Sequence, residues 1–163
     1  MPLWQIYHPP GTFEDASSKE SFAKDITQIY TSVGLPAFYV VVQYHKIDNH
    51  NVFIGGDSLS QASEVRQKPF IRLVVDHIAV RLPDDDALYA RTTTRIDSVL
   101  RPHLLEKGFD YEYHVDETER RLWKINGLIP PPHKSSEERV WFEENRPLPW
   151  DGAYPAKTLR QSL

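Results

Sequence analysis

The strongest constraint on the fold of this 163-residue chain is the order in which β-type and helical segments alternate. Leu3 to Tyr7 has the residues of a short strand, and the prolines and glycine that follow it favour a loop. The segment from about Ser17 to Val33 repeats its apolar residues at helical spacing. Ala37 to Tyr44 is rich in β-branched and aromatic residues and is expected to form a buried strand. Residues 2–56 are therefore predicted to contain a first β-α-β unit.

The same order recurs in residues 69–130. Pro69 to Val80 is predicted to be a strand, and Pro83 with the three aspartates after it marks the start of a helix, because acidic residues favour the positive end of the helix dipole. The helix is expected to run to about Leu100, and a strand is expected over residues 110–115. We therefore predict one α+β domain in which two β-α-β units form a four-stranded sheet with both helices on one face.

Residues 131–163 are expected to form a proline-rich C-terminal arm, since five of the 13 prolines lie within residues 130–149. A serine at 135 or 136 together with Glu138 is expected to cap a short helix through Phe142. The large aromatic residues of this arm require burial, either against their own domain or against a neighbouring subunit.

Composition excludes several classes of protein. The formal net charge of −4 argues against a nucleic-acid partner, because phosphate binding requires a basic surface. The absence of cysteine excludes disulfides and thiolate metal sites. No leader peptide and no apolar run of membrane-spanning length is found, so we expect a soluble, cytoplasmic protein with no membrane partner. None of the seven histidines has the spacing of a common metal motif, and we expect no metal and no cofactor.

Four features suggest a family. Pro2 follows Met1 and precedes an aromatic-containing strand, and residues 51–56 read NVFIGG. Arg81 follows the third predicted strand, and an ordered series runs from Tyr111 and Tyr113 through Trp123 and Pro130 to Trp141-Phe142. In these features the chain resembles the tautomerase superfamily, in particular the cis-3-chloroacrylic acid dehalogenase branch and its fungal members described as oxalocrotonate tautomerases. The resemblance implies a homotrimer of β-α-β subunits whose active sites surround an amino-terminal proline.

The resemblance also implies roles for particular residues. Pro2 would be the catalytic base after Met1 is removed, Arg81 would bind the substrate carboxylate, and Tyr113 would donate a hydrogen bond. Arg72 is a weaker candidate for substrate binding, because an odd spacing within a strand would place it on the opposite face from Arg81. Tyr113 is equally compatible with a packed strand tyrosine.

Three positions depart from the pattern of that branch. Tyr30 stands where the family has a histidine, Asp84 where it has a second arginine, and Lys124 on or near the position of the glutamate that activates water. Tyr30, Lys124 and Asn126 are kept as candidate substrate contacts, although core packing, a solvated lysine and a turn are the simpler interpretations of the three. These departures disfavour dehalogenation as that branch performs it.

A buried proline amine has chemistry suited to tautomerisation. An ordinary α-amino group has a pKa of roughly 8, and burial and a neighbouring arginine both lower it, so that the amine is neutral near pH 7 and can take a proton. An arginine holds a carboxylate with two parallel hydrogen bonds. The chain is therefore predicted to be a tautomerase for 2-oxo or enol carboxylates. A hydratase or dehalogenase of small unsaturated acids and a non-catalytic trimeric binding protein are the alternatives.

Overall fold

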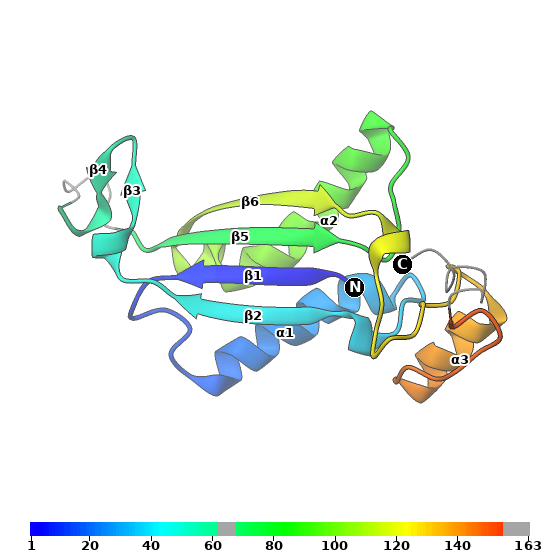
Figure 1. The fold of residues 1–163 in the computed structure, drawn as a ribbon. Coiled ribbons are helices and arrows are strands. Elements are labelled where there is room, and N and C mark those ends of the chain that lie inside the picture. Colours follow the sequence, from blue (N-terminus) through cyan, green and yellow to red (C-terminus); the bar gives the residue numbers. More distant parts are fainter. Residues whose placement is uncertain (62–67, 155–163) are drawn as a thin grey trace, which may run out of the picture.

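The computed structural model describes residues 1–61 and 68–154, and its centre is a four-stranded sheet in the order β2-β1-β5-β6 (Figure 1). The strands of this sheet are β1 (Leu3–His8), β2 (Val41–Lys46), β5 (Phe70–His77) and β6 (Asp110–Glu117). The helices are α1 (Ala16–Thr31), α2 (Asp86–His103) and α3 (Ser136–Glu144). A small two-stranded hairpin consists of β3 (Phe53–Ile54) and β4 (Asp57–Ser58).

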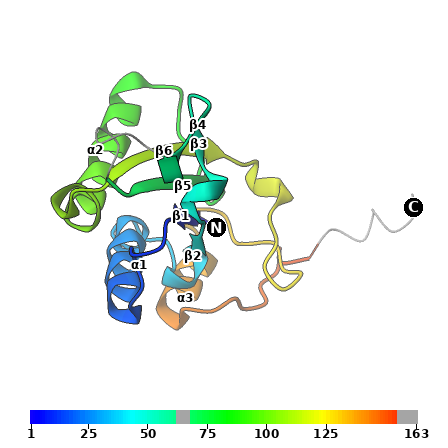
Figure 2. The ribbon, with the colours of Figure 1, turned by 90° about the vertical axis from the view of Figure 1, so that its left-hand side faces the viewer.

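The sheet is assembled from two parallel pairs. β1 pairs with β2 and β5 pairs with β6, each in parallel across a helix, while β1 and β5 are antiparallel neighbours at the centre. The helices α1 and α2 cover the same face of the sheet (Figure 2). The prediction of an α+β fold with two β-α-β units, one four-stranded sheet and two helices on one face is confirmed.

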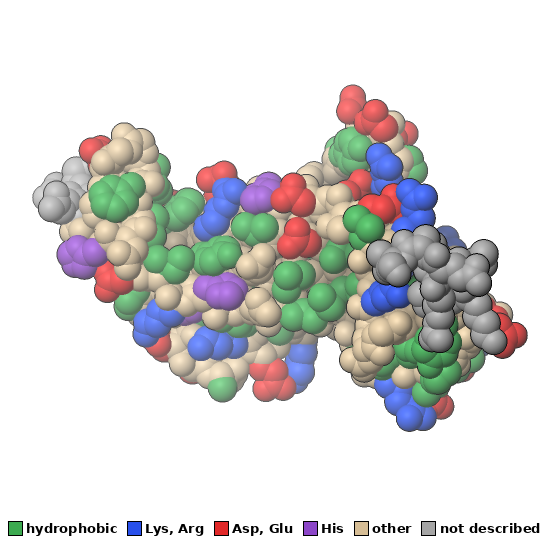
Figure 3. All heavy atoms as spheres, in the orientation of Figure 1, with side chains coloured by type: hydrophobic (Ala, Val, Ile, Leu, Met, Phe, Trp, Pro, Cys, Tyr) green, Lys and Arg blue, Asp and Glu red, His purple; other side chains and the backbone are tan. Residues whose placement is uncertain are grey.

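Alternation along the strands separates the two faces of the sheet. In β1 and β5 every second side chain is fully buried beneath the helices, as the two-residue repeat of a strand requires. The buried strand residues are Trp4, Ile6, Ile71, Leu73 and Val75, which pack with Phe22 and Ile26 of α1 and with Ile96 and Leu100 of α2. The opposite face of the sheet is open and mixes hydrophobic side chains with histidines and charged groups (Figure 3).

The helix ends follow the sequence signals. The carboxylate of Asp85 accepts a hydrogen bond from the Leu88 amide and thereby satisfies one free donor at the start of α2. Pro102 lies in the last turn of α2. Ser135 caps α3 in the same manner by accepting from the amide of Glu138. The predicted starts of both helices are therefore confirmed.

Two predicted strands are shorter than expected. Residues Ala37–Tyr39 form a 3-10 turn, in which the Tyr39 amide donates to the Pro36 carbonyl, so β2 begins only at Val41. β5 ends at His77, where its pairing with β6 also ends, and the chain then leaves the sheet toward α2. A 3-10 turn at Leu59–Gln61 follows β4, and residues 62–67 lie outside the described part.

The C-terminal segment packs on its own chain. Trp141 is 1% exposed, and its indole N–H donates to the Leu148 carbonyl, while the indole of Trp150 donates to the Ile129 carbonyl. Of the two locations left open for these tryptophans, the structure shows the one on the chain's own domain. No helix of the described residues is long and apolar enough to cross a bilayer.

Candidate functional site

A pocket of about 430 Å³ lies where the amino end of β1 and the carboxyl end of β5 meet the helices α1 and α2. Its walls are largely aliphatic and come from Ile29, Val33, Leu35, Ile78, Ala79, Val80, Leu82, Leu88 and Ile96. Its polar or ionisable lining residues are Tyr30, His77, Arg91, Thr92, Arg95, His133 and Lys134. Pro2 completes the lining, so the pocket combines an apolar wall, several basic groups and the start of the chain.

Pro2 is held at the sheet rather than on a loose tail. It is buried, and its carbonyl accepts a 2.9 Å hydrogen bond from the Val41 amide, which continues the parallel ladder between β1 and β2. Pro2 lies two residues before Trp4, so its ring is on the same side of β1 as the buried side chains of Trp4 and Ile6. The sheet therefore fixes the backbone of Pro2, and its ring lies on the face that the helices cover.

The amino terminus lies in an environment that disfavours positive charge. The pKa of the Met1 amine is lowered from its ordinary value to about 4, first because the group is buried and second because the Arg120 guanidinium is near. Glu138 acts in the opposite direction and raises this pKa. Burial and an arginine were the two influences expected for a basic amine, and the arginine that supplies the second is Arg120.

Arg120 itself is occupied by other contacts. Its guanidinium donates to the carbonyls of Ala79 and Pro131 and lies 3.4 Å from a carboxylate oxygen of Glu138. Glu138 is 1% exposed and also accepts from the Lys134 amide. Arg120 is thus an electrostatic neighbour of the amine, and its hydrogen-bonding capacity is committed to this buried network.

Arg91, which is exposed, and Arg95, which is half-buried, are the arginines among the residues that line the pocket. They lie four residues apart on α2 and therefore on one helix face. Among the described residues no carboxylate lies within ion-pair distance of either, and no Asp or Glu lines the pocket. Arg95 also donates to the Ser32 hydroxyl. A pocket with two arginines and no acid favours an anionic ligand.

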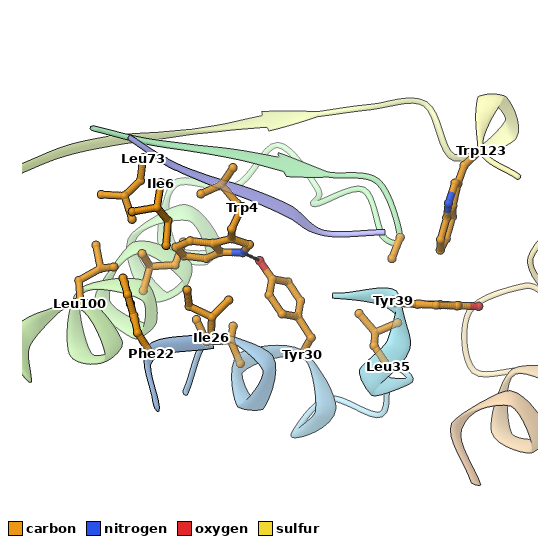
Figure 4. Close-up of a cluster of buried hydrophobic side chains, with 14 of the residues drawn as sticks. Trp4, Ile6, Phe22, Ile26, Tyr30, Leu35, Tyr39, Leu73, Leu100 and Trp123 are labelled. Atoms are coloured by element: carbon orange, nitrogen blue, oxygen red, sulfur yellow. Dashed lines mark hydrogen bonds between the residues drawn. The ribbon is translucent and has the colours of Figure 1, made fainter. Parts of the chain in front are cut away.

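Tyr30 stands between the core and the pocket. Its hydroxyl lies 2.8 Å from the Trp4 indole nitrogen and 2.7 Å from His77 Nε2 (Figure 4 shows the bond to Trp4). Burial raises the pKa of Tyr30, so its hydroxyl keeps its proton at neutral pH. Burial lowers the pKa of His77 to about 4, and the charge of the amino terminus adds to the same effect.

The structure brings together only part of the set of residues chosen from the sequence. Pro2 and Tyr30 line one pocket. Arg81 is exposed in the segment after β5 and is not among the lining residues. Arg72 lies on the open face of the sheet, where it pairs with Glu112.

The remaining candidates also lie away from Pro2. Tyr113 is on the covered face, but its hydroxyl donates to Asp97 at 3.0 Å. It lines a neighbouring groove beside β6 that shares Leu82 and Thr92 with the pocket. Lys124 is exposed. Asn126 is exposed with a positive φ of 50° in the turn that the Ile125–Leu128 bridge closes, which matches the turn interpretation.

Sequence reasoning missed His77, Arg91 and Arg95 as members of the site. For the arginines a signal was present, because Leu88, Arg91, Thr92, Arg95 and Ile96 follow the spacing of one helix face. Two arginines on one face of a helix, next to Leu88 and Ile96, place positive charge beside apolar residues, although Arg91 is exposed and Arg95 is half-buried. His77 gave no such signal, since its position in the two-residue repeat of β5 only places it on the covered face of the sheet. In the described residues no cluster of histidines and acids could hold a metal ion.

The fold and the pocket define the class of protein. Two β-α-β units in one sheet, with an apolar and cationic pocket at the start of the first strand, form a tautomerase-type subunit. Residues 1–146 match the model of the family described as "Putative oxalocrotonate tautomerase enzyme". The chain belongs to this family and thus to the tautomerase superfamily.

Solved structures agree with this assignment. The native RhCC protein of Rhodococcus jostii RHA1 is 36% identical, with a TM-score of 0.81 over 91% of this chain and 99% of that one. A probable enzyme from the thermophilic fungus Aspergillus fumigatus is 41% identical, with a TM-score of 0.80 over 92% and 98% of the two chains. A fused 4-OT, solved as a symmetric trimer, shares the fold at 16% identity, with a TM-score of 0.55 over 76% and 91%. A search of curated proteins gave no match.

Proposed function

We propose that this protein is a keto–enol tautomerase for 2-oxo and enol carboxylates, in which the amine of Pro2 is the general base once Met1 has been removed. One observation carries the proposal: Pro2 lines the same pocket as two arginines that have no carboxylate partner among the described residues. A base and an anion-binding pair within one apolar pocket are the groups that enolisation of a 2-oxo acid requires.

The environment of the amine supports its role as a base. The influences that lower the pKa of the Met1 amine are burial and Arg120. We expect both to act on the Pro2 amine as well, because Pro2 is buried one residue further into the sheet. A neutral secondary amine at neutral pH can remove a proton from carbon. The hydrogen bond from Val41 and the rigid pyrrolidine ring fix the direction of its lone pair.

Arg91 and Arg95 are the proposed clamp for the substrate carboxylate. Guanidinium groups bind carboxylates through paired hydrogen bonds, and the apolar walls strengthen that attraction by excluding water. Arg81 was expected in this role, but within its own chain it is exposed and is not among the residues that line the pocket. We therefore assign the clamp to Arg91 and Arg95 of the same chain.

The reaction then needs no group from outside the chain. With the carboxylate held by the arginines, the Pro2 nitrogen removes a proton from C3 of the 2-oxo acid. The electron pair of that C–H bond forms the C2–C3 double bond, and negative charge develops on the 2-oxygen. Return of the proton from the proline ammonium to that oxygen completes the enol. The reverse sequence converts an enol acid into the keto acid.

The aliphatic walls favour a substrate with an apolar substituent. A volume of about 430 Å³ lies within the range of roughly 300–1,000 Å³ that is typical of small-molecule pockets. Phenylenolpyruvate combines a carboxylate, an enol and an aryl ring and is therefore the proposed test substrate. A hydroxymuconate, with a second carboxylate, is the other substrate type to compare.

Hydration or dehalogenation of unsaturated acids is the alternative reaction. It requires a carboxylate that orients water, and no Asp or Glu lines the pocket in the described residues. Lys124, which stands on or near the position of the family's glutamate, is exposed and does not line the pocket. The geometry therefore favours tautomerisation.

We further propose that the subunit forms a homotrimer. The open face of the sheet carries hydrophobic side chains that no helix covers (Figure 3), and the fused 4-OT that shares this fold is a symmetric trimer. Sedimentation or light scattering would measure the mass of the assembly, and a monomer at micromolar concentration would contradict this assignment.

The test of the function begins with the amino terminus. Intact mass spectrometry of the purified protein is expected to show a chain that begins at Pro2. Turnover of phenylenolpyruvate is then compared between wild type, Pro2→Ala and the control Pro10→Ala, which changes an exposed proline in the loop after β1. We expect a large loss of kcat/KM for Pro2→Ala alone. Equal rates for wild type and Pro2→Ala would end the proposal, and tight substrate binding without turnover in wild type would favour a non-catalytic binding protein.

Covalent labelling provides a second readout. The crystal structure of Pt0534, a protein with a similar fold, was solved after its inactivation by 2-oxo-3-pentynoate. This acid carries an electrophilic triple bond and a carboxylate, so a neutral Pro2 amine next to the arginine pair is expected to add to it. A mass increase of one molecule located on the amino-terminal peptide is the expected result, and labelling elsewhere would count against Pro2.

A further inference from the structure

Pro2 stands opposite His77 at the end of the central antiparallel pair of strands. The register aligns Trp4 with Val75 and Leu3 with Asp76, and one further step aligns Pro2 with His77. Directly opposed residues on one face of a sheet have Cβ atoms roughly 4.5–5.5 Å apart. By the two-residue alternation of β1 and β5, both residues lie on the sheet face that the helices cover, and both line the pocket. His77 is therefore a near neighbour of the proposed base.

A chain of hydrogen bonds determines which nitrogen of His77 carries the proton. The Trp4 indole can only donate, so the Tyr30 hydroxyl accepts from it at 2.8 Å. Tyr30 is 5% exposed, and its own proton finds an acceptor in His77 Nε2 at 2.7 Å. In a neutral imidazole the proton then lies on Nδ1. This nitrogen has no hydrogen-bond partner among the described residues, and it is not sealed from solvent.

Most charged groups around the pocket oppose protonation of His77. Arg91 and Arg95 approach from α2 and Lys134 from the segment before α3, the amino terminus of β1 opposes it whenever that amine is charged, and Tyr30 of α1 is uncharged. Glu138 of α3 has the opposite sign and is paired with Arg120. His133, which also lines the pocket, is held by Glu138 at 2.9 Å. His77 is thus a neutral imidazole with a free N–H, and it belongs to the residues that line the pocket.

We infer that His77 Nδ1–H donates a hydrogen bond to the 2-oxygen of the substrate while Pro2 takes the proton from C3. This inference rests on the proposed tautomerase function and adds the group that stabilises the oxygen. As the C3–H electron pair becomes the C2–C3 double bond, the charge on the 2-oxygen grows and this hydrogen bond strengthens. The proton of His77 stays on Nδ1, and the proton on the Pro2 nitrogen is the one returned to the substrate. A neutral donor suits this task because it leaves no fixed charge on the product.

The decisive variants are His77→Gln, Tyr30→Phe and the control His50→Gln, which changes an exposed histidine in the turn before β3. Loss of a donor to a developing oxyanion costs on the order of 10²–10³ in kcat. We expect this loss for His77→Gln with little change in KM, since the arginines still bind the carboxylate. Tyr30→Phe keeps the His77 imidazole but removes the hydrogen bond that holds the proton on Nδ1. A smaller loss of kcat is therefore expected. His50→Gln is expected to match wild type.

A spectroscopic measurement separates this inference from the proposed function. In ¹⁵N NMR of the imidazole side chains, the signal lost in His77→Gln is expected to show a neutral Nδ1–H tautomer at pH 7 in wild type. The same signal is expected to shift toward the Nε2–H tautomer in Tyr30→Phe. A charged ring or an Nε2–H tautomer in wild type would overturn the inference whatever the activity is.

The kinetic results divide in the same way. Normal kcat in His77→Gln, in an enzyme that is inactivated by Pro2→Ala, would refute the role of His77 and leave the tautomerase function intact. Equal activity of wild type and Pro2→Ala would refute the proposed function, and the catalytic role of His77 would fail with it. A KM effect without a kcat effect in His77→Gln would make it a binding residue, which contradicts the inference.

Discussion

A guanidinium nitrogen of Arg120 lies 3.4 Å from a carboxylate oxygen of Glu138, and this largely buried ion pair stands beside the amino terminus. The pair joins the 3-10 turn at Arg120–Leu122 to α3. The Arg120 guanidinium also donates to the carbonyls of Ala79 and Pro131. The two charges act on the amine in opposite directions, with the arginine lowering its pKa and the glutamate raising it. The position of α3 therefore affects both the stability of the chain end and the basicity of the site.

The first prediction concerns this ion pair. Glu138→Ala is expected to lower the free energy of unfolding by about 3–5 kcal/mol, because it leaves the partly buried Arg120 without its carboxylate. The control Glu143→Ala removes an exposed i,i+4 partner of Arg139 and is expected to cost about 0–1 kcal/mol. Urea unfolding followed by tryptophan fluorescence measures both. Equal effects of the two variants would show that the buried pair is not a major source of stability.

Substrate binding provides the second prediction. Arg91→Ala and Arg95→Ala are each expected to raise KM about tenfold to a hundredfold, since each removes a charged hydrogen bond worth about 1.5–3 kcal/mol. Arg101→Ala changes an exposed arginine of the same helix that does not line the pocket and is expected to leave KM unchanged. If only Arg81→Ala raises KM, the clamp comes from a neighbouring subunit and the assignment to Arg91 and Arg95 is wrong.

The pH dependence of catalysis follows from the amine. Burial and Arg120 lower the pKa of the Met1 amine, and we expect the same two influences to lower that of the Pro2 amine. The base must be neutral to accept a proton. Activity is therefore present above the amine pKa and is lost as pH falls through it. We expect kcat/KM to be level through pH 7–8 and to decline only in acid, well below the ordinary α-amino value of roughly 8. A profile that still rises at pH 8 would show that the amine is exposed.

Tyr30→Phe tests the buried hydrogen bonds of the core. The substitution keeps the ring but leaves the Trp4 indole N–H, which is fully buried, without an acceptor (Figure 4). An unsatisfied buried donor costs about 1–3 kcal/mol, and that loss of unfolding free energy is expected. Tyr7→Phe removes the hydroxyl that bonds Gln5 on the open face and is expected to cost less. No difference between the two would mean that water replaces the Tyr30 hydroxyl.

His77 is expected to make stability depend on pH. Its pKa is about 4 in the folded chain and 6.5 in its ordinary state, so the unfolded chain binds the extra proton first. Its contribution to stability is complete above pH 6.5 and is lost as pH falls toward 4, by up to about 3 kcal/mol. Unfolding of wild type and His77→Gln at several pH values is the measurement. The stability difference between them should change over this interval, and a constant difference would contradict the shifted pKa.

Local patterns in the sequence were sufficient for much of the fold. The helical spacing of apolar residues predicted α1, and β-branched and aromatic composition predicted the strand segments, because these signals depend on local backbone geometry. Capping residues such as Asp85 and Ser135 mark helix starts for the same local reason. Strand ends were less predictable, since β5 ends at His77, where its partner β6 also ends, and not where its β-type sequence ends.

The site was only partly predictable. Pro2 and Tyr30 were named from the sequence and line one pocket. Arg81 and Tyr113 were chosen by resemblance, yet the first is exposed and the second bonds Asp97. Their sequence positions relative to the strands were correct, but the direction of each side chain depends on where the strand ends and how α2 packs.

The sequence by itself thus determined the order of strands and helices and a proline at the start of the first strand. Only the tertiary structure decided which groups meet that proline. Arg91, Arg95 and His77 are about 75–93 residues away along the chain and reach it through the antiparallel contact of β1 with β5 and the packing of α2. Such proximity depends on the closing of long loops and the docking of whole elements, and no local periodicity records it.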